Sequence, residues 1–318
     1  MQANNLKLNT YNSISECLCQ KKTIITIGTF DGVHIGHRTI LEKIINSAQG
    51  LHCESLVLTF FPHPRMILQE GSLVKLLNTM DEKIGLLQEI GIDNLIVHPF
   101  NKEFSQLTAE EFVKTILVDQ LQVQKIIIGY DHRFGINRSA DIKDLILFGD
   151  KYGFEVEQIS AQEIDAIAVS STKIRNALAN GTISLANEYL GYNYFFTGTV
   201  VKGKQLGRTI GFPTANIHIK EDYKLIPKNG VYLVKSPLNN TLAYGMMNIG
   251  KRPTVNGENQ TIEVHFIDFD QNLYGQEITI EVLEFIRDEH KFDSLESLKN
   301  QIQKDKDFCI TYLHNTTF

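Results

Sequence analysis

An uninterrupted apolar and β-branched run that leads directly into a turn of glycines and histidines constrains the fold of this chain most. Residues 25–37 read ITIGTFDGVHIGH. The run Thr23–Ile27 predicts a strand that is covered on both faces, because a half-exposed strand would alternate apolar and polar residues. The stretch Arg38–Ala48 has helical spacing of its apolar residues. The sequence therefore predicts a strand–turn–helix unit of an α/β protein, with a phosphate site in the turn.

The alternation of strand and helix continues to about residue 190. Further candidate strands lie at Ser55–Phe60, Asn94–His98, Lys125–Ile128 and Glu155–Gln158. Helical patterns lie at Asp81–Ile90, Ala109–Leu121, Ile142–Tyr152, Ser171–Ala179 and Ile183–Leu190, with Gly181 and Gly191 placed to end the last two. Strands that alternate with such helices predict βαβ units and a parallel sheet.

The pattern changes near Tyr194. From there to Ile286 the chain consists of short alternating stretches separated by turns, such as Thr261–Ile267 and Glu277–Phe285. This pattern is typical of an antiparallel barrel or sandwich. The end of the chain returns to a helical pattern, and Asp293 with Glu296 predicts a capping box at its start.

The length of 318 residues is also more than one ordinary core accommodates. We therefore expect two domains, residues 1–188 and residues 189–318.

Composition limits the classes of partner. Hydrophobic residues make up 42% of the chain and charged residues 21%, and the net charge is −6 without a basic run, which disfavours a nucleic-acid partner. Cysteines are few and form no CxxC pair, which favours reduced thiols; they are Cys17, Cys19, Cys53 and Cys309. Neither a signal peptide nor a membrane-spanning apolar stretch is evident. We expect a cytoplasmic protein without a membrane partner, as a monomer or weak homo-oligomer.

The glycine-histidine turn offers backbone amides and two imidazoles to one ligand. Gly28, Gly32 and Gly36 allow a close approach of the backbone, and Gly36 is expected to start a helix whose amides attract an anion. His34 and His37 are three residues apart, so both rings could reach one phosphate chain and stabilise charge at phosphorus. Two alternatives are a pair of purely structural histidines and a zinc site formed by His34, His37 and Asp31.

A second string, SSTKIRNAL at residues 170–178, predicts a hydroxyl-rich helix start. Serine and threonine there could cap the helix or bind phosphate, and Arg175 could form paired hydrogen bonds to phosphate oxygens. The alternative is an ordinary well-capped surface helix.

Two further strings, TFFPHPR and GYDHRFGINR, follow predicted strands, where open α/β sheets bind ligands. The first string offers His63 and Arg65 as substrate contacts, and the second offers Asp131, Arg133 and Asn137. The alternative is that either string is only a turn.

The second half carries the string GKQLGRTIGFPTANI at residues 203–217. Thr214 and Asn216 are alternate residues of an extended segment and point to one side, so a single Mg²⁺ could contact both oxygens. The alternative is a glycine- and proline-rich turn that Asn216 caps.

These strings resemble known signatures. The HxGH string at residues 34–37 resembles that of the nucleotidyltransferase superfamily, whose members transfer a nucleotidyl group from a nucleoside triphosphate and release pyrophosphate. GFPTAN at residues 211–216 resembles the riboflavin kinase signature. Four more strings fit in the same order: GVY at 230–232, MNIGKRPTV at 247–255, TIEVHFIDF at 261–269 and IRDEHKFDSLESL at 286–298. Nearly the whole chain thus resembles the bacterial bifunctional riboflavin kinase/FMN adenylyltransferases, also called FAD synthetases.

The resemblance implies a fold and two reactions. The fold would be an N-terminal Rossmann-like nucleotidyltransferase domain with a parallel sheet, followed by a riboflavin-kinase-like antiparallel β-barrel with a terminal helix. The barrel would transfer the γ-phosphate of ATP to the 5′-hydroxyl of riboflavin. The N-terminal domain would adenylylate the resulting FMN with a second ATP, yielding FAD and pyrophosphate. The substrates would be ATP, riboflavin and FMN, with Mg²⁺ as cofactor.

The resemblance also implies roles for individual residues. Glu263 would be the general base of the kinase, and catalysis of adenylyl transfer would rest on His34, His37 and Arg175. ATP in the N-terminal domain would contact Gly28, Thr29, Phe30, Asp31, Gly36, Ser170, Ser171 and Thr172. Flavin in that domain would contact His63, Asp131 and Arg133. In the barrel, ATP would contact Gly203, Gly207, Arg208, Thr214 and Asn216, Mg²⁺ would bind Thr214 and Asn216, and flavin would lie beside Arg287 and Phe292.

Two other functions compete with this interpretation. An aminoacyl-tRNA-synthetase-like or pantetheine-phosphate-type adenylyltransferase uses the same HxGH turn, but the chain has no KMSKS string and is too acidic for a tRNA surface. A flavin-binding module without catalysis could keep the barrel as a receptor, and it would not need Glu263 or the histidines.

Overall fold

The computed structural model describes residues 7–68, 74–129, 132–160, 169–203, 206–239, 241–254 and 257–316. It divides into two compact units, Met1–Ser171 and Thr172–Phe318. The division falls at the start of helix α7 (Ser171–Asn180). The functional boundary that the sequence predicts between residues 188 and 189 stays a prediction.

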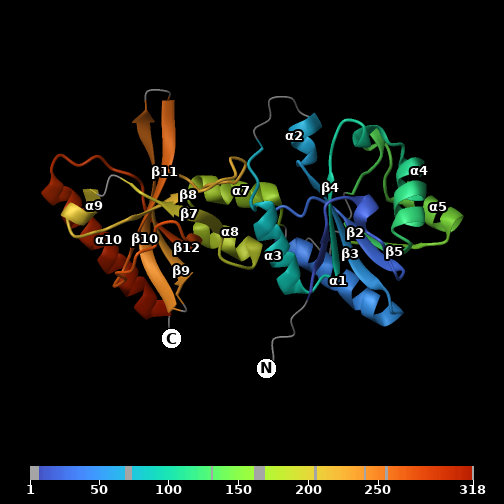
Figure 1. The fold of residues 1–318 in the computed structure, drawn as a ribbon, viewed down its shortest axis with the longest axis horizontal. Helices are drawn as coiled ribbons and strands as arrows, with labels where there is room; N and C mark the ends of the chain where they lie inside the picture. The colour runs from blue at the N-terminus through green and yellow to red at the C-terminus, as the bar shows by residue number, and fades with distance from the viewer. Residues whose placement is uncertain are drawn as a thin grey trace. The chain divides into compact units, whose positions relative to one another are not determined.

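The N-terminal unit is built on a six-stranded parallel sheet (Figure 1). Its strands are β1 (Asn9–Tyr11), β2 (Thr23–Ile27), β3 (Glu54–Phe61), β4 (Asn94–Pro99), β5 (Val123–Gly129) and β6 (Glu155–Ile159). They are ordered β1-β4-β3-β2-β5-β6, and every neighbouring pair is parallel, so the predicted parallel sheet is confirmed. The strand order reverses between β2 and β5. The carboxyl end of β2 therefore lies at the switch point where such sheets bind ligands.

The helices of this unit follow the predicted pattern with one difference. They are α1 (Ile35–Leu51), α2 (Pro64–Leu68), α3 (Met80–Ile90), α4 (Ala109–Glu111) and α5 (Ile142–Tyr152), with short 3₁₀ turns η1 (Ile14–Glu16), η2 (Phe104–Gln106) and η4 (Ile136–Arg138). The single helix predicted over 109–121 is instead α4 followed by a π-helix, η3 (Phe112–Gln120). The Leu121 N–H donates to the Ile116 carbonyl (2.9 Å), which closes the wider turn.

The core of the N-terminal unit lies on both faces of the sheet. Every residue of β2 is buried, as its continuous apolar run predicts. Ile25 lies in a cluster with Leu56 of β3 and with the buried side of η3. Helix α1 contacts β2, β3 and β5 and contributes the fully buried Leu41 and Ile44. Burial of these side chains holds α1 and the turn before it against the sheet.

The C-terminal unit contains a closed antiparallel barrel, which confirms the predicted barrel. The strands are β7 (Phe195–Val201), β8 (Ala215–His218), β9 (Gly230–Leu238), β10 (Thr241–Thr254), β11 (Gly257–Phe266) and β12 (Glu277–Arg287), in the order β10-β11-β8-β7-β12-β9. The helices are α7, α8 (Ile183–Leu190), α9 (Leu206–Thr209) and α10 (Leu295–Thr316). Helix α8 contacts β12, and α10 packs beside β10 through Cys309, which lies with Leu233, Met246 and Phe212.

Helix ends were predicted in part. Gly181 and Gly191 end α7 and α8 with left-handed φ angles of 78° and 76°, as expected. The capping box of Asp293 with Glu296 is wrong. Helix α10 begins at Leu295, and the Ser294 hydroxyl accepts a hydrogen bond from the Ser297 N–H (3.1 Å). Asp293 and Ser294 are adjacent residues that can both cap a helix, and the pattern alone placed the cap one residue too early.

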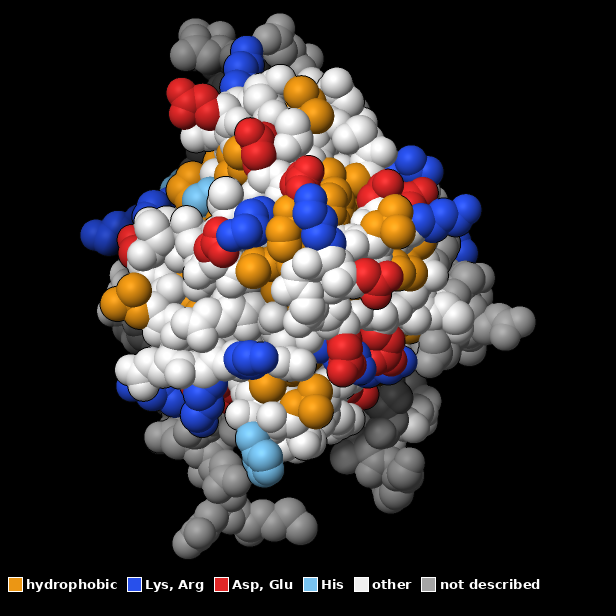
Figure 2. Space-filling view, turned by 90° about the vertical axis from the view of Figure 1, so that its right-hand side faces the viewer, with side chains coloured by type: hydrophobic (Ala, Val, Ile, Leu, Met, Phe, Trp, Pro, Cys, Tyr) orange, Lys and Arg blue, Asp and Glu red, His pale blue; other side chains and the backbone are white. Residues whose placement is uncertain are grey.

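The surface intermixes charges of both signs. Figure 2 shows lysine and arginine side chains beside aspartate and glutamate side chains on one face. Lys125, for example, pairs with Glu157 (2.6 Å), and Lys151 pairs with Glu110 (2.5 Å). Surface pairs of this kind, whether half-buried like Lys125–Glu157 or exposed like Lys151–Glu110, contribute little to stability, so the two cores carry the fold. None of the described helices combines the length and apolar character that a membrane crossing requires.

The position of the α10 cap can be tested by two matched substitutions. Ser294→Ala should lower the free energy of unfolding by about 1 kcal/mol, because it removes the acceptor of an otherwise unpaired helical N–H. Asp293→Ala should have a smaller effect. Urea unfolding followed by circular dichroism measures both changes. A larger loss of unfolding free energy in the Asp293 variant would show that Asp293 is the cap.

Candidate active sites

The turn between β2 and α1 has an unusual backbone. The Gly28 N–H donates to the Leu58 carbonyl (3.1 Å), which continues the sheet pairing past the end of β2. Phe30, Gly32 and Val33 then adopt positive φ angles of 45°, 87° and 36°. Helix α1 starts at Ile35 and His34 is its N-cap, so the prediction that Gly36 starts the helix is wrong by one residue. Two non-glycine residues in this region mark a constrained turn of the kind found at functional sites.

The two histidines of the turn lie against each other. The His34 Nδ1 accepts a hydrogen bond from the His37 backbone N–H (3.3 Å). The neutral His34 ring therefore carries its proton on Nε2. The two rings stack with 3.6 Å between centroids, and the Phe30 ring meets His37 edge-on at 5.1 Å. This arrangement brings both imidazoles to the start of α1, as one phosphate-binding site requires.

Both imidazoles are neutral at physiological pH. Burial lowers the pKa of His34 to about 4. Burial also lowers the pKa of His37 well below its usual value, and the nearby His34 and Lys83 lower it further. The His37 Nδ1 is buried without a hydrogen-bond partner within the described part of the chain. The pair therefore presents polar ring nitrogens for a ligand and adds no positive charge of its own.

Three side chains brace the turn. The Asp31 carboxylate accepts a hydrogen bond from the Leu77 N–H (2.9 Å), and the Ser171 hydroxyl donates to the Asp31 carbonyl (2.9 Å). The Lys83 ammonium of α3 donates to the Thr29 carbonyl (2.7 Å). Sequence reasoning identified Asp31 and Ser171 but missed Lys83, because a lysine inside an amphipathic helix carries no sign that it is buried.

The zinc alternative is wrong. Among the residues that the structure describes, which include His34, His37 and Asp31, no group of three histidine, cysteine or acidic side chains could hold a metal ion. His34 Nδ1 and an Asp31 oxygen already accept backbone hydrogen bonds.

The other residues predicted for the N-terminal domain lie at the start of α7, beside α2 and after β5. Ser170 and Thr172 are exposed at the start of α7, and Arg175 is half-buried one turn later. The His63 Nδ1 accepts from the Arg65 N–H (3.1 Å) at the start of α2. Arg133 is exposed after β5, and Asp131 lies outside the described residues. The binding roles of these residues stay predictions.

The second candidate site lies on the barrel, around Glu263 of β11. Strand pairing sets Glu263 opposite Asn216 of β8 on one side and opposite Asn248 of β10 on the other. Paired residues project from the same face of a sheet, so these three side chains are neighbours. The Thr214 hydroxyl donates to the Glu263 carboxylate (3.1 Å). The structure thus brings Thr214, Asn216 and Glu263 together.

Two glycines of this site leave room for their neighbours. A Cβ on Gly203 would overlap the Asn216 side-chain amide, and a Cβ on Gly207 would overlap the Phe212 carbonyl oxygen. The Phe212 N–H donates to the Gly207 carbonyl (2.8 Å), which closes the loop after α9. Arg208 is exposed on α9. Gly203 therefore leaves room for Asn216 beside Glu263, and contact of this loop with ATP stays a prediction.

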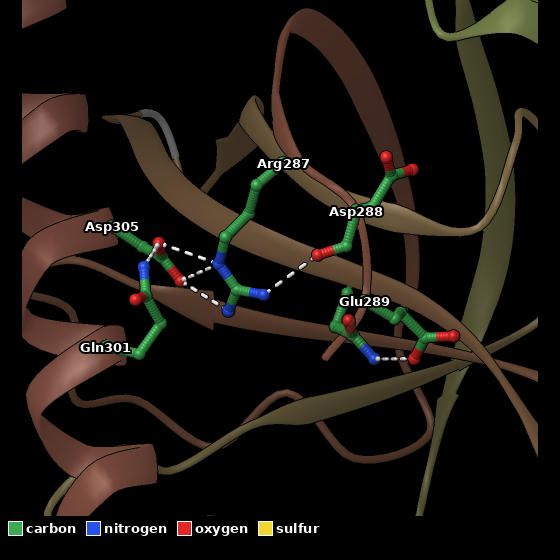
Figure 3. Close-up of polar contacts among 6 residues, drawn as sticks. Arg287, Asp288, Glu289, Gln301 and Asp305 are labelled. Atoms are coloured by element: carbon green, nitrogen blue, oxygen red, sulfur yellow. Dashed lines mark hydrogen bonds and ion pairs between the residues drawn. The ribbon is translucent and has the colours of Figure 1, made fainter. Parts of the chain in front are cut away.

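Arg287 anchors the end of β12 to the terminal helix (Figure 3). Its Nε and Nη2 donate to the Asp305 carboxylate of α10, with Nη2 to Oδ2 at 2.8 Å. Its Nη1 donates to the Asp288 carbonyl (3.0 Å), and Gln301 supports Asp305 from the same helix (2.9 Å). The guanidinium also lies 5.8 Å from the Phe292 ring centroid. This part-buried, multiply bonded pair fixes Arg287 beside Phe292, while flavin binding by the two stays a prediction.

Comparison with known proteins agrees with this two-site geometry. The family model for FAD synthetase matches residues 17–173, and the model for riboflavin kinase matches residues 190–313. A bifunctional riboflavin kinase/FMN adenylyltransferase of Haemophilus influenzae is 41% identical, over 88% of this chain and 91% of that protein. Its counterpart in Listeria monocytogenes is 38% identical, over 89% and 90%. The chain belongs to the bifunctional riboflavin kinase/FMN adenylyltransferase family.

Membership in this family confirms the predicted bifunctional enzyme of flavin biosynthesis, with kinase and adenylyltransferase activities. The competing interpretations, another HxGH adenylyltransferase or a flavin receptor, do not account for both matches.

A crystal structure of a Streptococcus pneumoniae protein named as a macrolide-efflux protein has the same fold over 94% of this chain and 97% of its own. The TM-score is 0.85 and the identity 28%. The efflux activity in that name is a statement about the pneumococcal protein and not about this chain.

The lowered pKa of His34 predicts a pH effect on stability. The folded-state pKa of about 4 lies below the usual 6.5, so the unfolded chain binds this proton more readily below about pH 6.5. Stability should therefore fall as the pH decreases towards 4. His34→Asn keeps a good helix cap but removes the titration, and from about pH 7 to about pH 4.5 it should lose about 2–3 kcal/mol less than the wild type. Urea unfolding at the two pH values measures this. Equal losses in both proteins would contradict the assigned neutral histidine.

Proposed function

We propose that the two reactions of this family are carried by two separate sites on this chain. Residues 189–318 phosphorylate the 5′-hydroxyl of riboflavin with ATP, and residues 1–188 adenylylate FMN with a second ATP, releasing pyrophosphate. One observation supports this division above all. The histidine pair belongs to the unit 1–171, the Thr214–Glu263 pair to the unit 172–318, and each unit has its own core.

In adenylyl transfer, the phosphate of FMN is already an anionic nucleophile and needs no strong base. The task of the protein is to stabilise charge at the α-phosphorus and on the pyrophosphate that leaves. The N–H groups of two neutral imidazoles and the first amides of α1 suit this task, because they donate hydrogen bonds without needing a proton from solvent. Arg175 adds a forked donor for phosphate oxygens. The predicted ATP contacts are residues 28–31, Gly36 and residues 170–172.

In the kinase reaction, the 5′-hydroxyl of riboflavin must lose a proton as it attacks the γ-phosphate. Glu263 accepts this proton in the proposal. The hydrogen bond from Thr214 and the pairing with Asn216 fix the direction of its carboxylate. A carboxylate held in this way needs little reorganisation at the moment of transfer.

The oxygen donors beside Glu263 fit a magnesium ion. The Thr214 hydroxyl and the Asn216 amide are hard oxygen ligands, and Gly203 leaves space for the Asn216 side chain. These two residues would hold Mg²⁺, which when bound neutralises phosphate charge on ATP. Gly203, Gly207 and Arg208 line the same loop and are the proposed ATP contacts.

The proposed flavin contacts are Arg287 with Phe292 in the barrel and His63, Asp131 and Arg133 in the N-terminal domain. Stacking of a flavin on the Phe292 ring is supported by the fixed guanidinium beside it. We expect small molecules to be the partners, without nucleic acid or membrane, and a monomer or weak homo-oligomer. We place the protein in the cytoplasm, where ATP is available for both reactions.

Paired variants test the division of labour. His37→Ala should lower FAD formation from FMN and ATP by about 100-fold, because a donor to the transition state is lost. It should leave FMN formation from riboflavin unchanged. Glu263→Gln should abolish FMN formation and leave FAD formation from added FMN unchanged. Chromatography of the flavins after incubation with ATP and magnesium measures all four rates.

Circular dichroism of both variants serves as the control for folding. If either folded variant loses both activities together, the two sites are not separate.

A further inference from the structure

Lys83 is a buried lysine that neither proposed reaction uses. It lies on α3 with only 3% of its surface exposed. Its ammonium donates a hydrogen bond to the carbonyl of Thr29 (2.7 Å), which belongs to the turn between β2 and α1. Helix α3 thereby brings a cation to the turn that carries the histidine pair.

The charge of this lysine is incompletely compensated inside the protein. A buried ammonium is costly unless carboxylates or several acceptors surround it. In the part of the chain that the structure describes, the Thr29 carbonyl is its hydrogen-bond acceptor and it forms no ion pair. Asp31 attracts it from a longer distance, but burial outweighs this attraction and lowers the Lys83 pKa to about 8. The site therefore has capacity for an additional anion.

Lys224 of the barrel shows what a compensated buried lysine looks like in this chain. It is 2% exposed and donates to the Phe195 carbonyl at the same 2.7 Å. Its ammonium also lies 4.7 Å from the ring centroid of Tyr194 and 5.6 Å from that of Phe195. Aromatic faces of this kind stabilise a cation. Lys83 has no such ring contact among the described residues, although its burial and its carbonyl bond match those of Lys224.

The neighbours of Lys83 show where its charge acts. It is close enough to His37 to affect the titration of that ring, and both histidines of the turn are neutral. Asp31 is held by the Leu77 N–H, and Glu82, the acidic neighbour on α3, accepts from the Thr79 N–H (2.9 Å). Lys83 is therefore a buried cation beside the turn that carries the histidine pair.

We propose that Lys83 is a positioning residue for adenylyl transfer: its ammonium holds the Thr29 carbonyl in place and attracts the phosphates of ATP to the turn. This inference rests on the proposed adenylyl-transfer function of the N-terminal domain. A charge in a water-poor site acts over a longer distance than one at the surface. It favours ATP before the reaction and favours the separated pyrophosphate more strongly, since negative charge grows there as the bond to the α-phosphorus breaks.

Three substitutions separate the charge of Lys83 from its hydrogen bond. Lys83→Met removes both, Lys83→Gln keeps a donor for Thr29 without the charge, and Lys83→Arg keeps both. Steady-state FAD formation from FMN and ATP, with inorganic pyrophosphate as product inhibitor, reads only the N-terminal reaction. The Met and Gln variants should both lose kcat/KM for ATP by about 100-fold and bind pyrophosphate more weakly, and the Arg variant should recover at least about a tenth of the wild-type value.

Lys224→Met is the matched control, because it removes an equally buried lysine and an equally short bond to a carbonyl. It should leave FAD formation from FMN unchanged. FMN formation from riboflavin should be unchanged in all three Lys83 variants, and circular dichroism shows whether their N-terminal unit is folded. Should the Met variant not fold, the contrast between Gln and Arg decides alone.

Wild-type kinetics in Lys83→Gln, or an equal loss of FAD formation in Lys224→Met, would overturn the proposed role of the charge. A wild-type chain that formed no FAD from FMN would instead overturn the proposed function itself.

Discussion

Complete burial of strand β2 determines where the chemistry of the N-terminal unit takes place. Because both faces of the strand are covered, a shift of register would expose apolar side chains or bury polar ones. The strand therefore ends at one place, at the switch point of the sheet, and the turn that follows must begin helix α1 within a few residues. His34 closes that turn as the helix cap, and the stack with His37 follows from the three-residue spacing. The position of the histidines is thus a consequence of core packing several residues earlier.

In the barrel, strand pairing rather than a turn positions the side chains of the site. Here antiparallel pairing sets Glu263 beside Asn216 and Asn248, and the hydrogen bond from Thr214 orients the carboxylate. A closed barrel has no edge strand that could slip, so the register of β8 and β11 is held from both sides. Asn216 and Glu263, which are 47 positions apart in the chain, are thereby kept side by side by strand pairing, which leaves the loops for substrate contact.

Sequence reasoning succeeded where the signal is local. The bounds of β2, α5 and α8 follow from apolar periodicity and flanking glycines, and the HxGH and PTAN strings identified the residues that the structure brings together. It failed where a contact joins distant segments. Nothing near Lys83 indicates that its ammonium reaches Thr29, and nothing near Arg287 indicates that Asp305 holds it. Strand β1 was missed because three polar residues at a sheet edge carry no periodic pattern. The cap of α10 depended on the choice between neighbouring residues that can all cap.

The central claim, that two independent sites act in succession on one flavin, can be tested by mixing two inactive proteins. A chain altered at His37 should stop at FMN when given riboflavin, and a chain altered at Glu263 should not start. An equimolar mixture of the two with riboflavin, ATP and magnesium should produce FAD, because FMN released by the first protein can enter the N-terminal site of the second. A mixture of folded proteins that accumulates FMN but never forms FAD would contradict the account.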